Sequence, residues 1–137
     1  MIDNAIFEFR KGDTYSRDFT ITDYESEISK VFFTVKSKSS DKRYVLQKTL
    51  NDGITLVSDE EGVKTYNILI NATDTDDMKV DYEYFFDIEI VSPGANNDEI
   101  KQTPIIGTLI LTEVATQTIN EEWYYASTIK QRWKNKC

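Results

Sequence analysis

The feature that most constrains the fold is an alternation of apolar and polar side chains with a period of two, which recurs along most of the chain. In residues 82–91, for example, Tyr82, Tyr84 and Phe86 share one parity and Glu83 takes the other. Successive side chains of a β-strand point to opposite faces of the sheet, so this period predicts half-buried strands. The other runs of this kind are residues 6–9, 15–22, 28–36, 44–50, 54–57, 64–70 and 103–112.

Turn signals separate these runs. Asp52-Gly53 favours positive φ, and residues 58–62 form a second, acidic turn. No helical pattern alternates with the strands, which disfavours a parallel α/β sheet. We therefore expect an all-β fold over residues 1–115, an antiparallel β-sandwich of about seven or eight strands that is immunoglobulin-like or jelly-roll-like.

Two residues interrupt the pattern in ways that predict local geometry. Arg17 falls on the inward row of residues 15–22, so we expect it to extend toward solvent over its neighbours or to lie near a sheet edge. Gly107 lies inside the last run, where it predicts a bulge or a close approach of another backbone.

Phe32 and Phe85 have the opposite parity from the apolar residues around them. Most of the 15 tyrosines and phenylalanines fall on inward positions and are expected in the core. These two should instead face outward, where they contact a partner or are covered by a C-terminal helix or a long loop. The second interpretation is slightly favoured by the sequence.

The character of the chain changes after Val114. Residues 116–137 are expected to form a linker and a short amphipathic α-helix, with Asn120 as its N-cap. An isolated short helix is marginal in water, so this segment must dock on its own sandwich or on a neighbouring subunit. The predicted protein-interface residues are Trp123, Tyr124, Tyr125, Ile129 and Trp133.

Composition excludes several classes of function. The chain has no histidine, which excludes histidine-based catalysis and imidazole-bound zinc, and its one cysteine, Cys137, excludes an internal disulfide. The net charge of −8 argues against nucleic-acid binding, and no apolar run approaches the roughly 18 residues of a membrane span. We expect no enzyme activity, no cofactor, no metal and no small-molecule substrate.

One acidic loop has a spacing that some calcium sites use. Asp74, Asp76 and Asp77 are close in sequence, but they lack the glycine and the distal glutamate of an EF-hand. The favoured interpretation is a capped turn, and calcium binding is left open. The other strong acidic candidates fall in turns or on outward positions, which gives no basis for a pair of catalytic carboxylates.

The order of segments resembles small structural proteins of tailed phages and prophages, in particular the β-sandwich N-terminal domain of upper baseplate proteins. The resemblance covers about residues 6–115. It rests on Phe9-Arg10-Lys11-Gly12-Asp13-Thr14-Tyr15, Val31-Phe32-Phe33-Thr34-Val35-Lys36, Asp52-Gly53-Ile54, Ala72-Thr73-Asp74-Thr75, Tyr84-Phe85-Phe86-Asp87-Ile88 and Thr103-Pro104-Ile105-Ile106-Gly107-Thr108-Leu109. It implies a virion component that binds other subunits and has no catalysis or cofactor.

We therefore expect a tail- or baseplate-type structural or assembly protein, present in several copies in the virion and assembled in the bacterial cytoplasm. A capsid decoration or head-fibre attachment protein is the first alternative. A glycan-binding module is the second, with Tyr24 and Tyr44 as its candidate contacts, and an acidic mimic of nucleic acid is the third. The sequence leaves open the position in the virion, the stoichiometry, the partner, and whether the C-terminal helix docks in cis or in trans.

Overall fold

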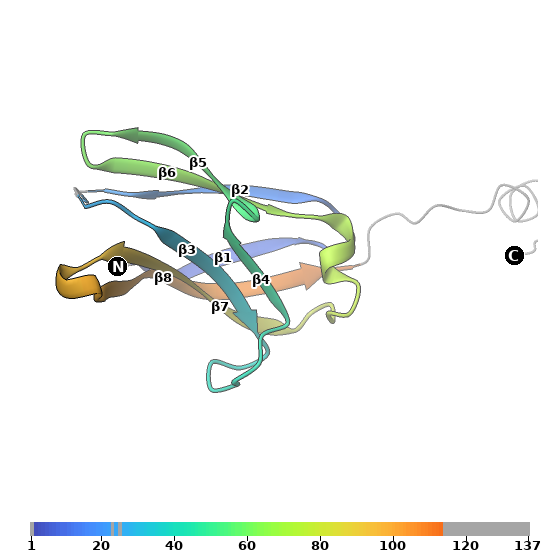
Figure 1. Cartoon of the computed structure of the whole chain (residues 1–137). Coiled ribbons are helices and arrows are strands. Elements are labelled where there is room, and N and C mark those ends of the chain that lie inside the picture. Colours follow the sequence, from blue (N-terminus) through green and yellow to red (C-terminus); the bar gives the residue numbers. More distant parts are fainter. Residues whose placement is uncertain (1, 23, 25, 114–137) are drawn as a thin grey trace, which may run out of the picture.

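The computed structural model describes residues 2–22, 24 and 26–113, and these residues form an all-β domain (Figure 1). The eight predicted strand regions are all present. The strands are β1 (Ile2–Arg10), β2 (Tyr15–Ile21), β3 (Lys30–Lys36), β4 (Leu46–Leu50), β5 (Gly53–Glu60), β6 (Val63–Ile70), β7 (Glu83–Pro93) and β8 (Glu99–Thr112), with 3-10 turns η1 (Ala72–Thr75) and η2 (Ala95–Asn97) between them. The predicted C-terminal helix lies outside the described residues. Among those residues, no helix is long and apolar enough to cross a membrane.

The eight strands form one hydrogen-bonded sheet in the order β1-β8-β7-β3-β4-β5-β6-β2. The sheet folds over on itself, so that β2, β6 and β5 form one layer of a sandwich and β1, β8, β7 and β3 the other (Figure 1). Strand β4 pairs with β3 of the second layer and joins it to β5 of the first. The pairing between β4 and β5 is short, because only Thr49 with Gly53 and Leu50 with Ile54 are in register. The two edges of the sheet are β1 and β2.

The expectation of an antiparallel sheet needs one correction. The pairs β1 with β8 and β4 with β5 are parallel, whereas the other pairings of the described strands are antiparallel. The β4–β5 pairing is confined to the tight turn at residues 51–52, whereas two parallel strands that pair along their length, such as β1 and β8, need a long connection between them. Almost the whole domain connects β1 to β8, and the alternation within each strand carries no information about that pairing.

The inward rows predicted from the alternation are buried between the two layers. On β3, Val31, Phe33 and Val35 are fully buried, and the matching positions on the other strands join the same core. Three phenylalanines cluster at its centre: the ring of Phe7 lies 4.4 Å from that of Phe86 and 5.7 Å from that of Phe33. Such aromatic contacts add to the free energy gained by burying apolar area.

The two interruptions of the pattern have the predicted kinds of geometry. Arg17 lies on the edge strand β2, and its guanidinium sits over the ring of Phe7 at 5.1 Å and donates a hydrogen bond to the hydroxyl of Tyr15 at 2.8 Å. Gly107 pairs with Ala5 of β1, and a Cβ at this position would clash with the carbonyl oxygen of Ala5. A close backbone approach therefore explains this glycine, and the register of β1 against β8 shifts beside it, between Ile2 and Ala5.

The acidic loop before β7 is a capped turn, as the sequence favoured. The carboxylate of Asp74 accepts a hydrogen bond from the backbone N–H of Asn71 at 2.7 Å. The same carboxylate lies 2.7 Å from the ammonium of Lys48, a pair that is largely buried. Within the described residues, no group of three or more histidine, cysteine, aspartate or glutamate side chains is arranged to hold a metal ion.

The structure extends β7 and β8 beyond the predicted runs. Strand β7 continues through Pro93, and its last four residues pair with the first four of β8, from Ile90 opposite Gln102 to Pro93 opposite Glu99. We expected β8 to begin at residue 103, because residues 99–102 show no alternation. Backbone hydrogen bonding to the neighbouring strand fixes this stretch, whatever the side chains are.

Candidate interaction surfaces

The outer faces of the two layers are the first place to look for a functional surface. In the layer of β2, β6 and β5, a group of outward polar side chains on β2 and β6 bond to one another, and the exposed apolar residues Val63 and Leu69 of β6 lie beside this group. The amide of Asn67 donates to Ser16 Oγ at 2.7 Å and to Asp18 Oδ1 at 2.9 Å, and the hydroxyls of Thr20 and Thr65 lie 3.1 Å apart. We call these five residues the polar outer face. Their polar groups are suited to water.

The outer face of the other layer is different, because aliphatic and aromatic side chains lie on it in neighbouring strands. Register places Ile6 of β1 opposite Thr108 of β8, and Thr108 opposite Phe85 of β7. Phe85 and Phe32 are half-buried, and Ile6 is 57% exposed. The apolar outer face consists of Ile6, Phe32, Phe85, Ile106 and Ile110.

Two shallow grooves lie on this apolar outer face. One, of about 390 Å³, runs along Ile6, Phe85 and Ile106, and the other, of about 300 Å³, runs along Phe32. Asp87 lines the second groove, and its partial burial raises the pKa of its carboxyl above the ordinary value, although Lys36 acts in the opposite direction. Phe32 and Phe85 face outward, as predicted, and no loop or helix among the described residues covers the grooves.

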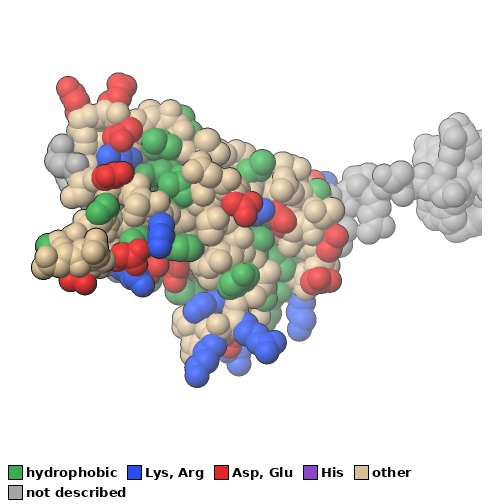
Figure 2. Space-filling model, viewed as in Figure 1, with side chains coloured by type: hydrophobic (Ala, Val, Ile, Leu, Met, Phe, Trp, Pro, Cys, Tyr) green, Lys and Arg blue, Asp and Glu red, His purple; other side chains and the backbone are tan. Residues whose placement is uncertain are grey.

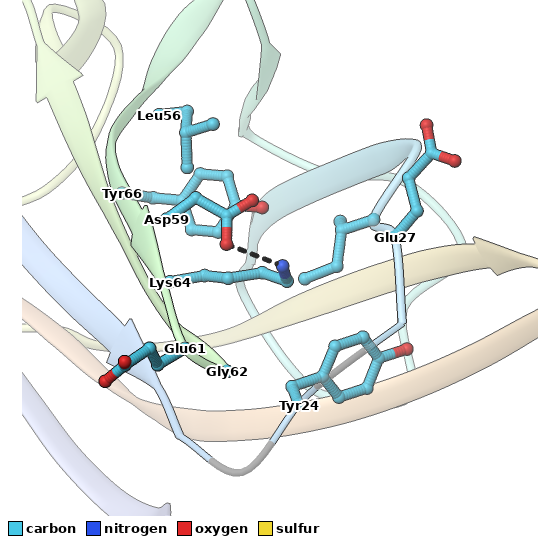
Figure 3. Close-up of a pocket in the computed structure, with 9 residues that line it drawn as sticks. Tyr24, Glu27, Leu56, Asp59, Glu61, Gly62, Lys64 and Tyr66 are labelled. Carbon is cyan, nitrogen blue, oxygen red and sulfur yellow. Dashed lines mark hydrogen bonds and ion pairs between the residues drawn. The ribbon is translucent and has the colours of Figure 1, made fainter.

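A third concave site, the end pocket, has a volume of about 540 Å³ and lies where the β5–β6 hairpin meets the segment after β2 (Figure 3). It is lined by Tyr24, Glu27, Ile28, Leu56, Asp59, Glu61, Gly62, Lys64 and Tyr66. The side chain of Lys64 is 9% exposed, and its ammonium lies 2.9 Å from Asp59 Oδ1. This contact compensates a lysine charge that would be costly to bury alone.

Two tyrosines line the end pocket in different ways. The hydroxyl of Tyr24 hydrogen-bonds with that of Ser92, and the Tyr24 backbone N–H donates to the carbonyl of Gly62 at 3.0 Å. Tyr66 is only 2% exposed, and its burial, together with the charge of Asp59, raises the pKa of its hydroxyl above the ordinary value. The Tyr66 hydroxyl has no hydrogen-bond partner among the residues that the structure describes.

The two tyrosines proposed as glycan contacts do not form one platform. Tyr24 precedes the start of β3 and lines the end pocket, whereas Tyr44 lies in the loop at the other end of β3 and is 56% exposed. A strand of seven residues, such as β3, is about 23 Å long. Neither the end pocket nor the grooves could be predicted from the sequence, because each combines residues that are distant in the chain.

The predicted interface residues Trp123, Tyr124, Tyr125, Ile129 and Trp133 lie outside the described residues, so their role stays a prediction.

Comparisons with known proteins add little to this geometry. No family model matches the chain, and no curated protein matches it. A solved structure of the NK cell receptor NKp44 aligns at 12% identity with a TM-score of 0.43, over 80% of this chain and 98% of the receptor chain. MtrC from Shewanella baltica OS185 aligns at 13% identity with a TM-score of 0.42, over 85% of this chain, which spans about a quarter (24%) of that protein.

Proposed function

We propose that this chain is a non-catalytic structural or assembly protein of a tailed-phage virion, of the tail or baseplate type, which binds neighbouring subunits. Support comes from the apolar outer face, because a sheet face that carries Ile6, Phe85 and Ile106 and is not covered by a described segment is typical of a protein interface. The resemblance of the strand and turn motifs to phage structural proteins supplies the place of action.

In this proposal the sandwich is a rigid spacer, and contacts form on the apolar outer face and through the C-terminal segment. Residues 116–137 carry both tryptophans, and Trp123 and Trp133 would act as anchors in pockets of a neighbouring subunit. Repetition of the chain in a symmetric particle adds avidity, so a single contact can be modest. The helical form of this segment and the immunoglobulin-like or jelly-roll-like assignment of the sandwich stay predictions.

The test is incorporation into particles. Particles released by a lysogen that encodes the chain are purified, and the copy number of the chain is measured by mass spectrometry. In wild-type particles we expect several copies of the chain. When Trp123→Ala and Trp133→Ala are combined, at least nine-tenths of these copies should be lost. A tenfold loss corresponds to about 1.4 kcal/mol of binding free energy, which the loss of a single anchor can account for. Particles that never contain the chain would contradict the proposal.

The same particles separate the proposal from its alternatives. If the chain is found with isolated capsids, it is a decoration or head-fibre attachment protein. If it is found with isolated tails, it is of the tail or baseplate type. Tight binding to a glycan array by purified chain would favour the host-recognition alternative.

A further inference from the structure

The end pocket has more acidic than basic side chains. Asp59 is matched by Lys64, but Glu27 and Glu61 are exposed and have no ion-pair partner among the residues that the structure describes. The nearly buried hydroxyl of Tyr66 also lacks a hydrogen-bond partner within that part of the chain. A pocket with two unmatched carboxylates, a phenol oxygen and aromatic rings suits a cationic side chain.

A loop elsewhere in the same molecule carries the complementary charge. Residues 37–45 connect β3 to β4 and form the basic loop, where Lys38, Lys42 and Arg43 are exposed and have no ion pair among the described residues. The carboxylate of Asp41 is occupied within the loop, because it accepts a hydrogen bond from the backbone N–H of Lys38 at 3.2 Å. Figure 2 shows lysine and arginine side chains gathered over this loop and acidic side chains at the tip of the β5–β6 hairpin.

Exposed apolar side chains accompany both charged regions. In the end pocket, the lining residue Leu56 is 45% exposed. On the basic loop, Tyr44 is 56% and Val45 43% exposed. Charge and apolar area are therefore complementary between the two regions, which is the composition of a specific interface with an aromatic and arginine anchor.

We propose that the basic loop of one copy of this chain docks into the end pocket of a second copy, an inference that rests on the proposed function as a multicopy assembly component. Arg43 enters the pocket, where its planar guanidinium donates hydrogen bonds to the carboxylate of Glu61. Arginine suits this role better than lysine, because its fork of donors matches carboxylates in two-point contacts. Tyr44 packs beside Leu56 at the rim.

The fold requires this contact to be intermolecular. The basic loop follows the end of β3, and the end pocket lies near its beginning, so the rigid length of the strand, about 23 Å, separates them. The backbone hydrogen bond from Val45 N to Val35 O, 2.7 Å long, holds the loop at its own end. A contact between two different patches joins copies head to tail, or pairs two copies reciprocally when both contacts form in one dimer.

The experiment is a charge exchange in the full-length chain, followed by sedimentation equilibrium in about 0.1 M salt. Arg43→Glu alone and Glu61→Lys alone should each weaken self-association about tenfold or more, because each places like charges against one another. The two substitutions combined in one chain should restore association to within about threefold of the wild type, because the exchanged charges attract again.

The matched control replaces an exposed acid on another surface. Asp13 lies in the turn between β1 and β2 and is exposed, so Asp13→Lys combined with Arg43→Glu should not restore association. Circular dichroism and thermal melting verify that each variant is folded. Failure of the exchanged pair to recover in a folded chain, or a wild type that stays monomeric at millimolar concentration, would overturn the inference.

The outcome is independent of the test of the proposed function. If neither single substitution changes self-association, the contact between the loop and the pocket is overturned. The proposed function stands in that case as long as the chain is found in particles. If the double variant restores self-association but the wild-type chain never enters particles, the proposed function is overturned and the contact between copies stands.

Discussion

The two outer faces of the sandwich are built from the same kind of strand but are suited to different surroundings. On β2 and β6, Asn67 bonds to Ser16 and Asp18, so these polar groups satisfy one another, and Leu69 beside them is 38% exposed. On β1, β7 and β8 the equivalent positions hold Ile6, Phe85 and Ile106. An antiparallel sheet needs only one apolar face to fold. A second apolar face therefore points to a role outside the domain's own stability.

The largest effect should come from the core that both layers share. Phe86 is fully buried and contacts Phe7 and Phe33. Phe86→Ala is expected to lower the free energy of unfolding by about 3–5 kcal/mol, because it removes buried apolar area and leaves a cavity. Urea denaturation followed by fluorescence measures this loss. A loss below about 1 kcal/mol would show that the two layers do not share one packed core.

On the apolar outer face, function should change more than stability. Ile6→Thr combined with Ile106→Thr should reduce incorporation into particles about tenfold, while unfolding changes by no more than about 1–2 kcal/mol, because Ile6 is exposed and Ile106 is half-buried. Quantitative mass spectrometry of purified particles measures the first quantity and urea denaturation the second. Thr65→Ala on the polar outer face is the control, and equal losses from both changes would remove the distinction between the faces.

On the polar outer face, a substitution should change stability and leave incorporation into particles unaffected. Asn67→Ala deletes hydrogen bonds to Ser16 and Asp18 on a partly exposed surface, so the expected cost is about 0.5–1 kcal/mol of unfolding free energy. Incorporation into particles should stay at the wild-type level. Reduced incorporation without loss of stability would mean that the polar face also binds a partner.

The smallest effect concerns Asp87 in the groove beside Phe32. Burial raises the pKa of this carboxyl in the folded chain, so the folded state binds a proton more readily than the unfolded state. Stability from this group is therefore gained as pH falls through the raised pKa and is lost as pH rises above the ordinary value of 3.8.

Asp87→Asn should remove that pH dependence and stabilise the chain at neutral pH by about a few tenths of a kcal/mol, within the range of surface substitutions. Thermal melts at pH 3 to 7 measure the difference. Glu83→Gln, an exposed substitution on the same strand, is the comparison. A larger stabilisation in Glu83→Gln than in Asp87→Asn would contradict the role of burial.

The regions that were predictable and those that were not differ in the range of the interactions involved. The alternation located the strands and their inward rows, and Asn71 with Asp74 identified the capped turn, because these are local relations along the chain. The start of β8 and the parallel pairing of β1 with β8 were not predictable, because they depend on which strand lies alongside. The end pocket was missed for the same reason, since Tyr24 and Lys64 meet only in the folded chain.

The sequence by itself determined that this protein is an all-β domain with a shared aromatic core and outward-facing Phe32 and Phe85, because side-chain parity in a strand is fixed by the backbone. The sequence also excluded histidine-based catalysis and imidazole-bound zinc, because the chain has no histidine. Only the tertiary structure decided that the outward apolar residues of β1, β7 and β8 share one face, with polar residues such as Asp87 and Thr108 between them, and that acidic and basic regions lie at opposite ends of β3. Those arrangements depend on strand order and on the folding of the sheet over itself, and contacts between distant segments set both.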